Sequence, residues 1–166
     1  MNSTAPGLDR AFSALAYVMP LASALQASGP FLRFLSQQAP PAYQFFNAIF
    51  SFPPLAFLIA LDNSIFGIVI FFGLFFFVVR NTDISRFIRF NVLQAILVSL
   101  MISITLLILS FLPITQGVLQ PLGVALLNTL FLGGFILVVY AVAQSVMGRY
   151  AEIPTISDAV NTQMPY

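Results

Sequence analysis

The sequence contains no cysteine, no histidine and no lysine. Without cysteine there is no disulfide framework, no thiol nucleophile and no thiolate metal site. Without histidine the chain lacks the commonest metal ligand and general base. No nucleophile, base and orienting group can be assembled from what is left, and no two acidic residues fall within apolar runs. We therefore predict neither a cofactor nor an enzymatic activity.

Charge is scarce too. Only 7% of the 166 residues are charged, against about 25% in soluble domains. Hydrophobic residues make up 60% of the chain, including 19 phenylalanines. So few charges could not cover the surface of a soluble protein, whereas lipid can cover an integral membrane protein. The net charge of +1 is too small to indicate nucleic-acid binding. The composition predicts an all-α integral membrane protein.

Apolar runs and turn residues divide the chain into one membrane domain, residues 1–166. Four transmembrane helices are expected, and the shortest would reach only about 24 Å. The aromatic-rich segment between the first two is too short to cross and should lie in the interface or re-enter. Pro20 predicts a kink in the first span. The expected segments are a flexible N-terminus at 1–9, spans at 11–34, 64–79, 90–112 and 121–148, the interfacial or re-entrant segment at 43–61, an Arg-rich loop and helix start at 80–89, and a tail at 149–166 with a short amphipathic helix.

Two of these spans carry small or weakly polar residues on one face. In lipid, such residues let helix backbones approach closely, so they predict packing faces. The third span has this spacing at Asn91, Ala95, Ser99 and Ser103, and the fourth at Gly134, Val138, Ala141, Ser145 and Gly148.

The arginines set the expected orientation. Four spans would put both termini and the loop at 80–89 on one side of the membrane. That side would hold all the arginines except Arg33, an asymmetry that places it in the cytoplasm or the stroma. The arginines of that side are Arg10, Arg80, Arg86, Arg89 and Arg149.

Local signals predict helix starts. Thr82 or Asp83 could be the N-cap of the third span, which would leave Arg86 and Arg89 in first turns where the helix dipole disfavours cations. Asp62 could be an intramembrane functional carboxylate. The neighbouring Asn63 and the preceding prolines favour instead a residue at a helix start near the membrane surface.

The polar residues around the arginine loop have two interpretations each. Arg86 and Arg89 could bind lipid phosphate, an acidic partner or a passing polypeptide, or could only determine topology. Asn91 and Gln94 could line a polar path, or could bond across helices or to backbone carbonyls. In the tail, Pro154 is acceptable at a helix start and Thr155 with Asp158 fits a capping box.

Two motifs carry a resemblance to a known family. The first is Arg80-Asn81 with ISRFIRFNVLQAIL at 84–97, and the second is YAEIPTISDAV at 150–160. Together they resemble the twenty-kilodalton subunit family of TIC, the translocon of the chloroplast inner envelope. The candidate partner-binding, lipid-binding or topology residues are Arg80, Asn81, Arg86, Arg89, Asn91, Gln94, Arg149, Glu152 and Pro154.

The resemblance implies a four-helix subunit of a preprotein-conducting channel, with both termini in the cytoplasm or stroma. The start of the chain does not look like a transit peptide, which favours a cyanobacterial or plastid-encoded homologue. The expected membrane is a cyanobacterial plasma or thylakoid membrane or the plastid inner envelope. Expected partners are other membrane subunits or further copies of the chain, anionic lipid headgroups and a translocating polypeptide. The alternatives are a structural or assembly subunit of a photosynthetic-membrane complex without transport activity, and a small-solute transporter.

Overall fold

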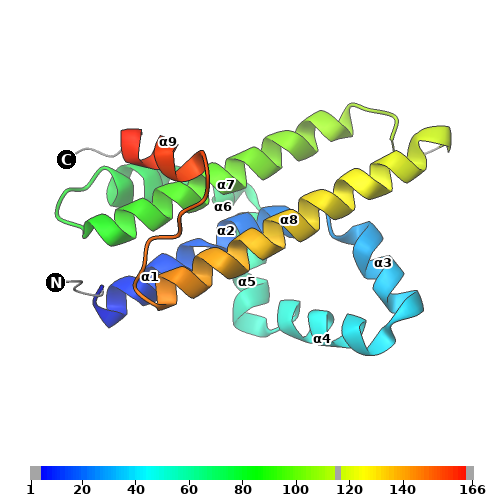
Figure 1. The fold of residues 1–166 in the computed structure, drawn as a ribbon, viewed down its shortest axis with the longest axis horizontal. Coiled ribbons are helices and arrows are strands. Elements are labelled where there is room, and N and C mark those ends of the chain that lie inside the picture. The colour runs from blue at the N-terminus through cyan, green and yellow to red at the C-terminus, as the bar shows by residue number, and fades with distance from the viewer. Residues whose placement is uncertain (1–4, 115–116, 164–166) are drawn as a thin grey trace.

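In the computed structural model, residues 5–114 and 117–163 are described, and helices are the only regular secondary structure in this part of the chain (Figure 1). This confirms the predicted all-α class. The helices are α1 (Gly7–Ala16), α2 (Val18–Leu25), α3 (Gly29–Gln38), α4 (Pro40–Phe50), α5 (Pro53–Asp62), α6 (Ile65–Gly73), the π-helix η1 (Leu74–Val79), α7 (Arg86–Ser110), the 3₁₀ turn η2 (Gly117–Leu119), α8 (Gln120–Val146) and α9 (Ile156–Gln163).

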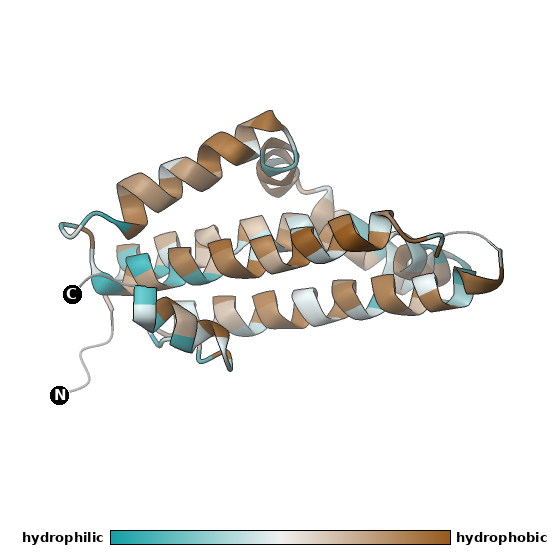
Figure 2. Ribbon diagram, turned by 90° about the horizontal axis from the view of Figure 1, so that it is seen from above, coloured by the Kyte–Doolittle hydropathy of each residue, from teal (hydrophilic) through white to brown (hydrophobic). Residues whose placement is uncertain are grey.

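The core lies where α1 and α2 pack against the two long helices α7 and α8. The helix η1 covers another part of α7, and α9 lies on α7 near its start. The long helices are hydrophobic along most of their length, and hydrophilic residues are densest near the end where the chain begins and finishes (Figure 2). Helices α1 and α9 and the start of α7 share this end, which we call the arginine end because Arg80 and Arg86 also lie there.

Two helices in the described part are long and apolar enough to cross a membrane, 86–110 and 117–146. Two further pairs qualify by composition but are bent, by 78° between 7–25 and 29–38, and by 73° between 40–50 and 53–62. The helical stretch 65–79 is apolar but shorter. The chain is a multi-pass membrane protein with up to four such spans, and its path relative to the bilayer stays a prediction.

The segment expected to form one kinked span over 11–34 is broken twice in the structure. The helix is interrupted at Tyr17, three residues before Pro20. Because proline has no amide hydrogen, residue 20 cannot donate the helical hydrogen bond to the carbonyl of Ala16. A second break at Ser28 turns α3 away from the bundle. Prolines then lie at the first positions of α3, α4, α5 and α8, where the missing amide costs nothing.

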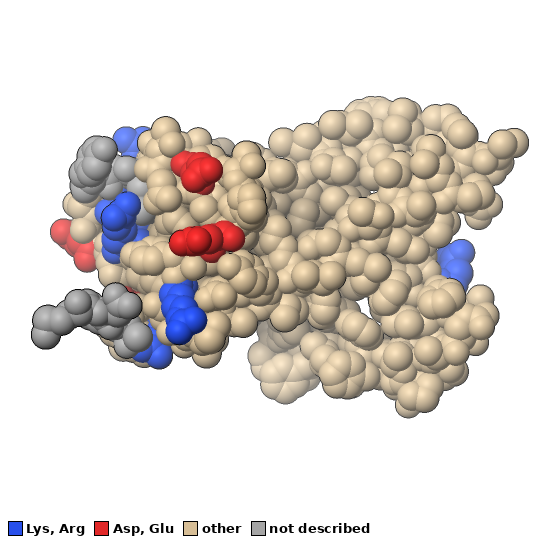
Figure 3. Space-filling model, in the orientation of Figure 1, with Lys and Arg blue, Asp and Glu red and all other residues tan. Residues whose placement is uncertain are grey.

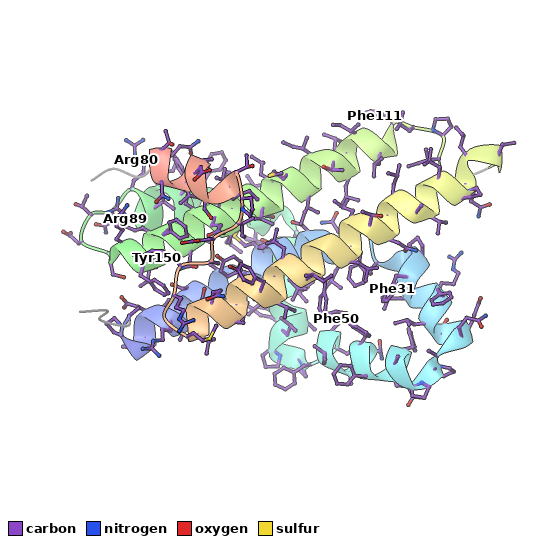
Figure 4. All side chains as sticks on the ribbon, in the orientation of Figure 1. Phe31, Phe50, Arg80, Arg89, Phe111 and Tyr150 are labelled. Atoms are coloured by element: carbon purple, nitrogen blue, oxygen red, sulfur yellow. The ribbon has the colours of Figure 1, made fainter. Side chains whose placement is uncertain are left out.

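The segment expected at the interface, 43–61, forms α4 and α5 with a sharp bend between them. Its aromatic rings do not all face outward. Phe46 packs against Phe135 of α8 with ring centroids 5.7 Å apart, and Phe31 of α3 packs against Phe131 at 5.4 Å. Figure 4 shows Phe31 on α3 and Phe50 on α4, the two helices that turn away from the bundle beside α8. Ring packing therefore holds these two helices against α8.

Serine, rather than the predicted residues, caps two helices. Ser85 precedes α7 and its Oγ accepts from the amide of Ile88 at 3.4 Å, so neither Thr82 nor Asp83 is the N-cap. Ser64 precedes α6 and its Oγ accepts from the amide of Phe66 at 3.2 Å. Both serines satisfy amides that the first helical turn leaves without partners.

The predicted small-residue faces pack over most of their length, although Ser103 is exposed and Gly148 is only half-buried. Ala95 and Ser99 are buried on α7, and the α8 face is buried from Gly134 to Ser145. A Cβ atom added at Gly134 would lie 3.0 Å from Cβ of Ala24 and 3.1 Å from Cδ1 of Ile102. Gly134 therefore sets the distance at which α2, α7 and α8 cross.

Candidate functional site

Burial divides the predicted site residues into two groups. Arg89, Asn91 and Gln94 are 4%, 0% and 0% exposed, and all three lie in the first turns of α7. The remaining candidates are exposed at the arginine end: Arg80, Asn81, Arg86, Arg149, Glu152 and Pro154. In the space-filling view, basic side chains gather at this end, while the middle of the visible face is uncharged (Figure 3). The buried residues stabilise the fold, whereas the exposed residues are accessible to a lipid or a partner.

The two arginines in the first turns of α7 have different environments. Arg86 is exposed, whereas Nε of the buried Arg89 donates to the carbonyl oxygen of Val79 at 2.9 Å. Val79 is the last residue of η1, so its carbonyl lies at the negative end of that helix. The dipole of α7 disfavours a cation at Arg89, and the negative C-terminal end of η1 stabilises it. Figure 4 shows Arg80 and Arg89 close to this junction.

Asn91 is the centre of a buried polar network. Its Oδ1 accepts from Tyr17 Oη and from Ser145 Oγ, each at 3.0 Å, and its Nδ2 donates to the carbonyl of Phe87 at 2.8 Å. These bonds join α7 to the α1–α2 break and to α8. The geometry supports the interpretation of Asn91 as an interhelical bonding group, since its amide is committed to protein partners.

Gln94 holds the tail against α7. Its Nε2 donates to the carbonyl of Ala151 at 3.0 Å, and Ser157 Oγ donates to the same carbonyl at 3.1 Å. Ser157 Oγ also accepts from the amide of Ile153 at 2.7 Å. The polypeptide after α8 is therefore fixed to the first turns of α7 by side chains.

Aromatic packing reinforces this contact. The ring of Tyr150 lies 5.3 Å from that of Phe87 and 4.9 Å from that of Phe90, with both pairs edge to face. Helix α9 begins at Ile156, and Thr155 has φ of 70°, so the backbone there is not the extended one that a capping box requires. The two family-like motifs, far apart in the sequence, form one surface in the fold.

Sequence reasoning missed three members of this network, Tyr17, Ser145 and Ser157. Tyr17 stands in an apolar run and could as well have faced lipid. Ser145 had been assigned only to a small-residue face. Helical spacing shows that such residues share a face, but it does not show which residue of another helix they meet.

Asp62 is placed differently from expectation. It is the last residue of α5 rather than a helix-start residue, since the N-cap of α6 is Ser64. A Cβ at Gly67 would collide with the carbonyl oxygen of Asp62, so the glycine allows α6 to turn back closely over the end of α5. Asp62 is half-buried, and the amide of Gln26 donates to Oδ1 of its neighbour Asn63 at 2.8 Å.

The chemistry of the arginine end is that of charge and hydrogen bonding. Among the described residues, no group of three or more histidine, cysteine, aspartate or glutamate side chains is placed to hold a metal ion. The exposed arginines offer guanidinium donors that suit phosphate and carboxylate groups. The buried side-chain amides of Asn91 and Gln94 hold together the helices and the tail that carry these arginines.

Comparison with known proteins gives a match along almost the whole chain. Residues 7–160 match the model of a family described as "Chloroplast import apparatus Tic20-like". A "Tic20 family protein" of Synechocystis sp. is 43% identical over 99% of this chain and 98% of its own length. "Protein TIC 20-II, chloroplastic" of Arabidopsis thaliana is 32% identical over 96% of this chain and 74% of its own length. A "Tic20 family protein Ycf60" of Gracilaria tenuistipitata var. liui is 35% identical over 95% and 76%.

Proposed function

The chain belongs to the Tic20-like family, and from that premise we propose that it is a non-enzymatic subunit of a membrane complex that conducts polypeptides across the bilayer. The observation that carries the proposal is the match over residues 7–160, which includes the whole bundle and the docked tail. Family membership supports a membrane subunit related to protein translocation. The conducting role itself is the proposed part.

The packing of the bundle suggests how such a subunit would contribute. Tyr17, Asn91 and Ser145 bond to one another in the core, and the surrounding core is largely apolar. Three buried polar atoms of the described residues have no hydrogen-bond partner and are scattered rather than aligned along one path: Ser13 Oγ, Gln94 Oε1 and Asn128 Oδ1. A path for a polypeptide needs a polar, hydrated wall. We therefore propose that the path lies between this chain and further copies or other membrane subunits, and that the chain forms one part of the wall.

The exposed residues at the arginine end are available to lipids and to other subunits of the complex. Arg80, Arg86 and Arg149 could bind anionic lipid headgroups or an acidic partner, at about 1 kcal/mol for each arginine near a charged surface. We propose that this end, with both termini, faces the cytoplasm or stroma, because the exposed arginines gather there. The fitting membranes are a cyanobacterial plasma or thylakoid membrane and the plastid inner envelope.

The proposal is tested on the purified protein in two ways. Oligomers reconstituted in planar bilayers should conduct ions, and a stalled precursor polypeptide should crosslink to photoreactive residues in the protein. A native gel of the solubilised membrane should show a large complex whose partners include other translocation subunits. Failure to conduct or crosslink, together with co-purification with a photosynthetic complex, would favour a structural or assembly subunit instead.

A further inference from the structure

A polar pocket of about 360 Å³ lies between α2, the junction of α5 and α6, and α7. Its polar lining comes from separate places in the chain, so the sequence alone does not group it. The residues of this lining that carry the argument are Ser23, Gln26, Asp62, Asn63, Ser99 and Ser103. We call it the Asp62 pocket.

The Asp62 pocket lies well away from both ends of the bundle. At a rise of about 1.5 Å per residue, Ser99 is about 20 Å along α7 from Arg86, and Ser103 is about 10 Å from Ser110. Side chains beside the pocket have the apolar exposure expected of a lipid-facing surface, with Ile65 77% and Ile68 60% exposed. The pocket is thus a polar site beside exposed apolar side chains, and the predicted spans would place it within the hydrocarbon layer.

The neutral polar groups of the pocket bond to one another. Oγ of Ser23 and Oγ of Ser99 are 2.6 Å apart, Ser103 Oγ donates to Ser23 Oγ at 3.4 Å, and Gln26 bonds to Asn63. The carboxylate of Asp62 forms no hydrogen bond or ion pair with any other residue that the structure describes. The pocket therefore brings together hydroxyl oxygens that can still accept and one carboxylate, which only accepts.

A carboxylate in such a pocket is stabilised by a positive partner. Placing an aspartate at the centre of a membrane helix costs about 2.5–3.5 kcal/mol or more, and such residues are typically paired or functional. The two nearby helix ends have opposing effects on the negative charge of Asp62. The C-terminus of α5 disfavours a negative charge and the N-terminus of α6 favours it. The side chain itself sets the local charge.

The described part of the chain, residues 5–114 and 117–163, places no cation in the lining of the pocket. The pocket lining contains no arginine; Arg33 is on α3, and the others lie toward the arginine end. A second copy in the same orientation would carry its arginines at the same depths and could not supply one either. The counter-ion must come from another molecule.

A second cavity indicates what kind of cation fits. An apolar cavity of about 450 Å³ lies between α1, α5, η1 and α7, and it shares Met19 and Asp62 with the Asp62 pocket. Its other lining side chains are hydrophobic, among them Phe12, Leu58 and Leu74. The polar and the apolar cavity thus adjoin at Met19 and Asp62.

We propose that Asp62 is the counter-ion of a site for an amphipathic monocation, an alkylammonium or guanidinium head with an apolar chain. One carboxylate balances one positive charge, the hydroxyls of Ser23, Ser99 and Ser103 accept from the nitrogen head, and the apolar chain lies in the larger cavity. Two sources share this chemistry, a free amphipathic amine and a basic residue within an apolar polypeptide segment. The polypeptide source rests on the proposed function, whereas the free amine does not.

The absence of cysteine makes a direct test possible, since Leu100→Cys introduces a single thiol in the lining of the pocket and leaves its hydroxyl groups in place. In lipid nanodiscs, a cationic methanethiosulfonate should label this pocket thiol at least about tenfold faster than an anionic one, which corresponds to a modest Coulomb attraction in a partly hydrated site. Asp62→Asn should abolish the preference. Ser110→Cys, near the far end of α7, is the matched control, and its thiol should show little preference in either background.

Protection by a ligand completes the test and does not depend on Asp62→Asn folding. Octylammonium should slow labelling of the pocket thiol at least about tenfold, while nonanoate, with the same eight-carbon alkyl tail, should not. Equal protection by both, equal labelling by the two reagents, or labelling of the control thiol with none of the pocket thiol would overturn the proposal. A peptide with one arginine in an apolar segment identifies the polypeptide source if it protects, and protection by octylammonium alone identifies a free amine.

The readout uses purified protein and no transport. A protein that conducts no polypeptide can still show the charge preference, and a translocation subunit can lack it. Failure of the site and failure of the proposed function are therefore distinguishable.

Discussion

Tyr17 donates through Oη to Oδ1 of Asn91 at 3.0 Å, across 74 positions of sequence and inside the core of the bundle. The same oxygen accepts from Ser145, so one amide joins three helical segments. In lipid, a bond of this kind replaces partners that water cannot supply.

Asn91→Ala is expected to lower the free energy of unfolding by about 1–3 kcal/mol, because two buried hydroxyl groups lose their acceptor. Unfolding by SDS titration in mixed micelles measures this change. The matched control is Asn47→Ala on the exposed surface of α4, which should change stability by no more than about 0.5 kcal/mol. Equal effects at the two positions would show that the network contributes nothing specific.

Gly134→Leu is expected to destabilise the protein by about 2 kcal/mol or more, because α2 or α7 must move to admit the side chain. Its neighbour Gly133 has no atom within 4 Å of an added Cβ, so Gly133→Leu should be neutral or slightly stabilising. The same SDS titration compares the pair. A neutral Gly134→Leu variant would contradict the close crossing described here.

Arg89→Gln is expected to loosen the junction of η1 and α7, because the buried carbonyl of Val79 loses its charged donor. The cost should be about 1–3 kcal/mol, seen as faster hydrogen exchange over 74–80. Arg86→Gln should leave that exchange unchanged and instead reduce the retention of anionic lipid roughly fivefold, measured by native mass spectrometry. The reverse pattern would mean that the two arginines have been assigned to the wrong roles.

Ser157→Ala is expected to loosen the tail between Ala151 and Ser157, because both hydrogen bonds of the Ser157 hydroxyl lie within this segment. Ser157 Oγ accepts from the amide of Ile153, so exchange at that amide should rise by about 5- to 30-fold for a loss of about 1–2 kcal/mol. Thr162→Val removes an exposed hydroxyl that bonds only within α9, and it is the control. Unchanged exchange at Ile153 would indicate that the Gln94 hydrogen bond and the ring contacts of Tyr150 hold this part of the tail without the Ser157 hydroxyl.

Single cysteines test the expected orientation. Thr82→Cys, in the turn before α7, should react with an impermeant thiol reagent only from the cytoplasmic or stromal side, and Ser36→Cys on α3 only from the opposite side. Right-side-out and inverted vesicles give the two readings. Labelling of both positions from one side would reject the predicted topology.

Patterns that depend only on local chemistry were predictable. Hydropathy over about twenty residues and the scarcity of charge identify a membrane protein, because a span must satisfy its own backbone and face lipid. Small residues at helical spacing identified the packing faces of α7 and α8. Two motifs were enough to indicate the family, which the comparisons then showed.

The sequence by itself thus determined the class of protein, the approximate position of its long helices and the end at which its arginines gather. Only the tertiary structure decided that Arg86 is exposed while Arg89 is buried against Val79, that Asn91 joins Tyr17 to Ser145, and that Asp62 borders two cavities. These outcomes depend on crossing angles, on the breaks near Tyr17 and Ser28, and on the backbone distance that Gly134 allows. Spacing along a helix specifies a face, whereas the partner of that face is set by helices that lie far away in the chain.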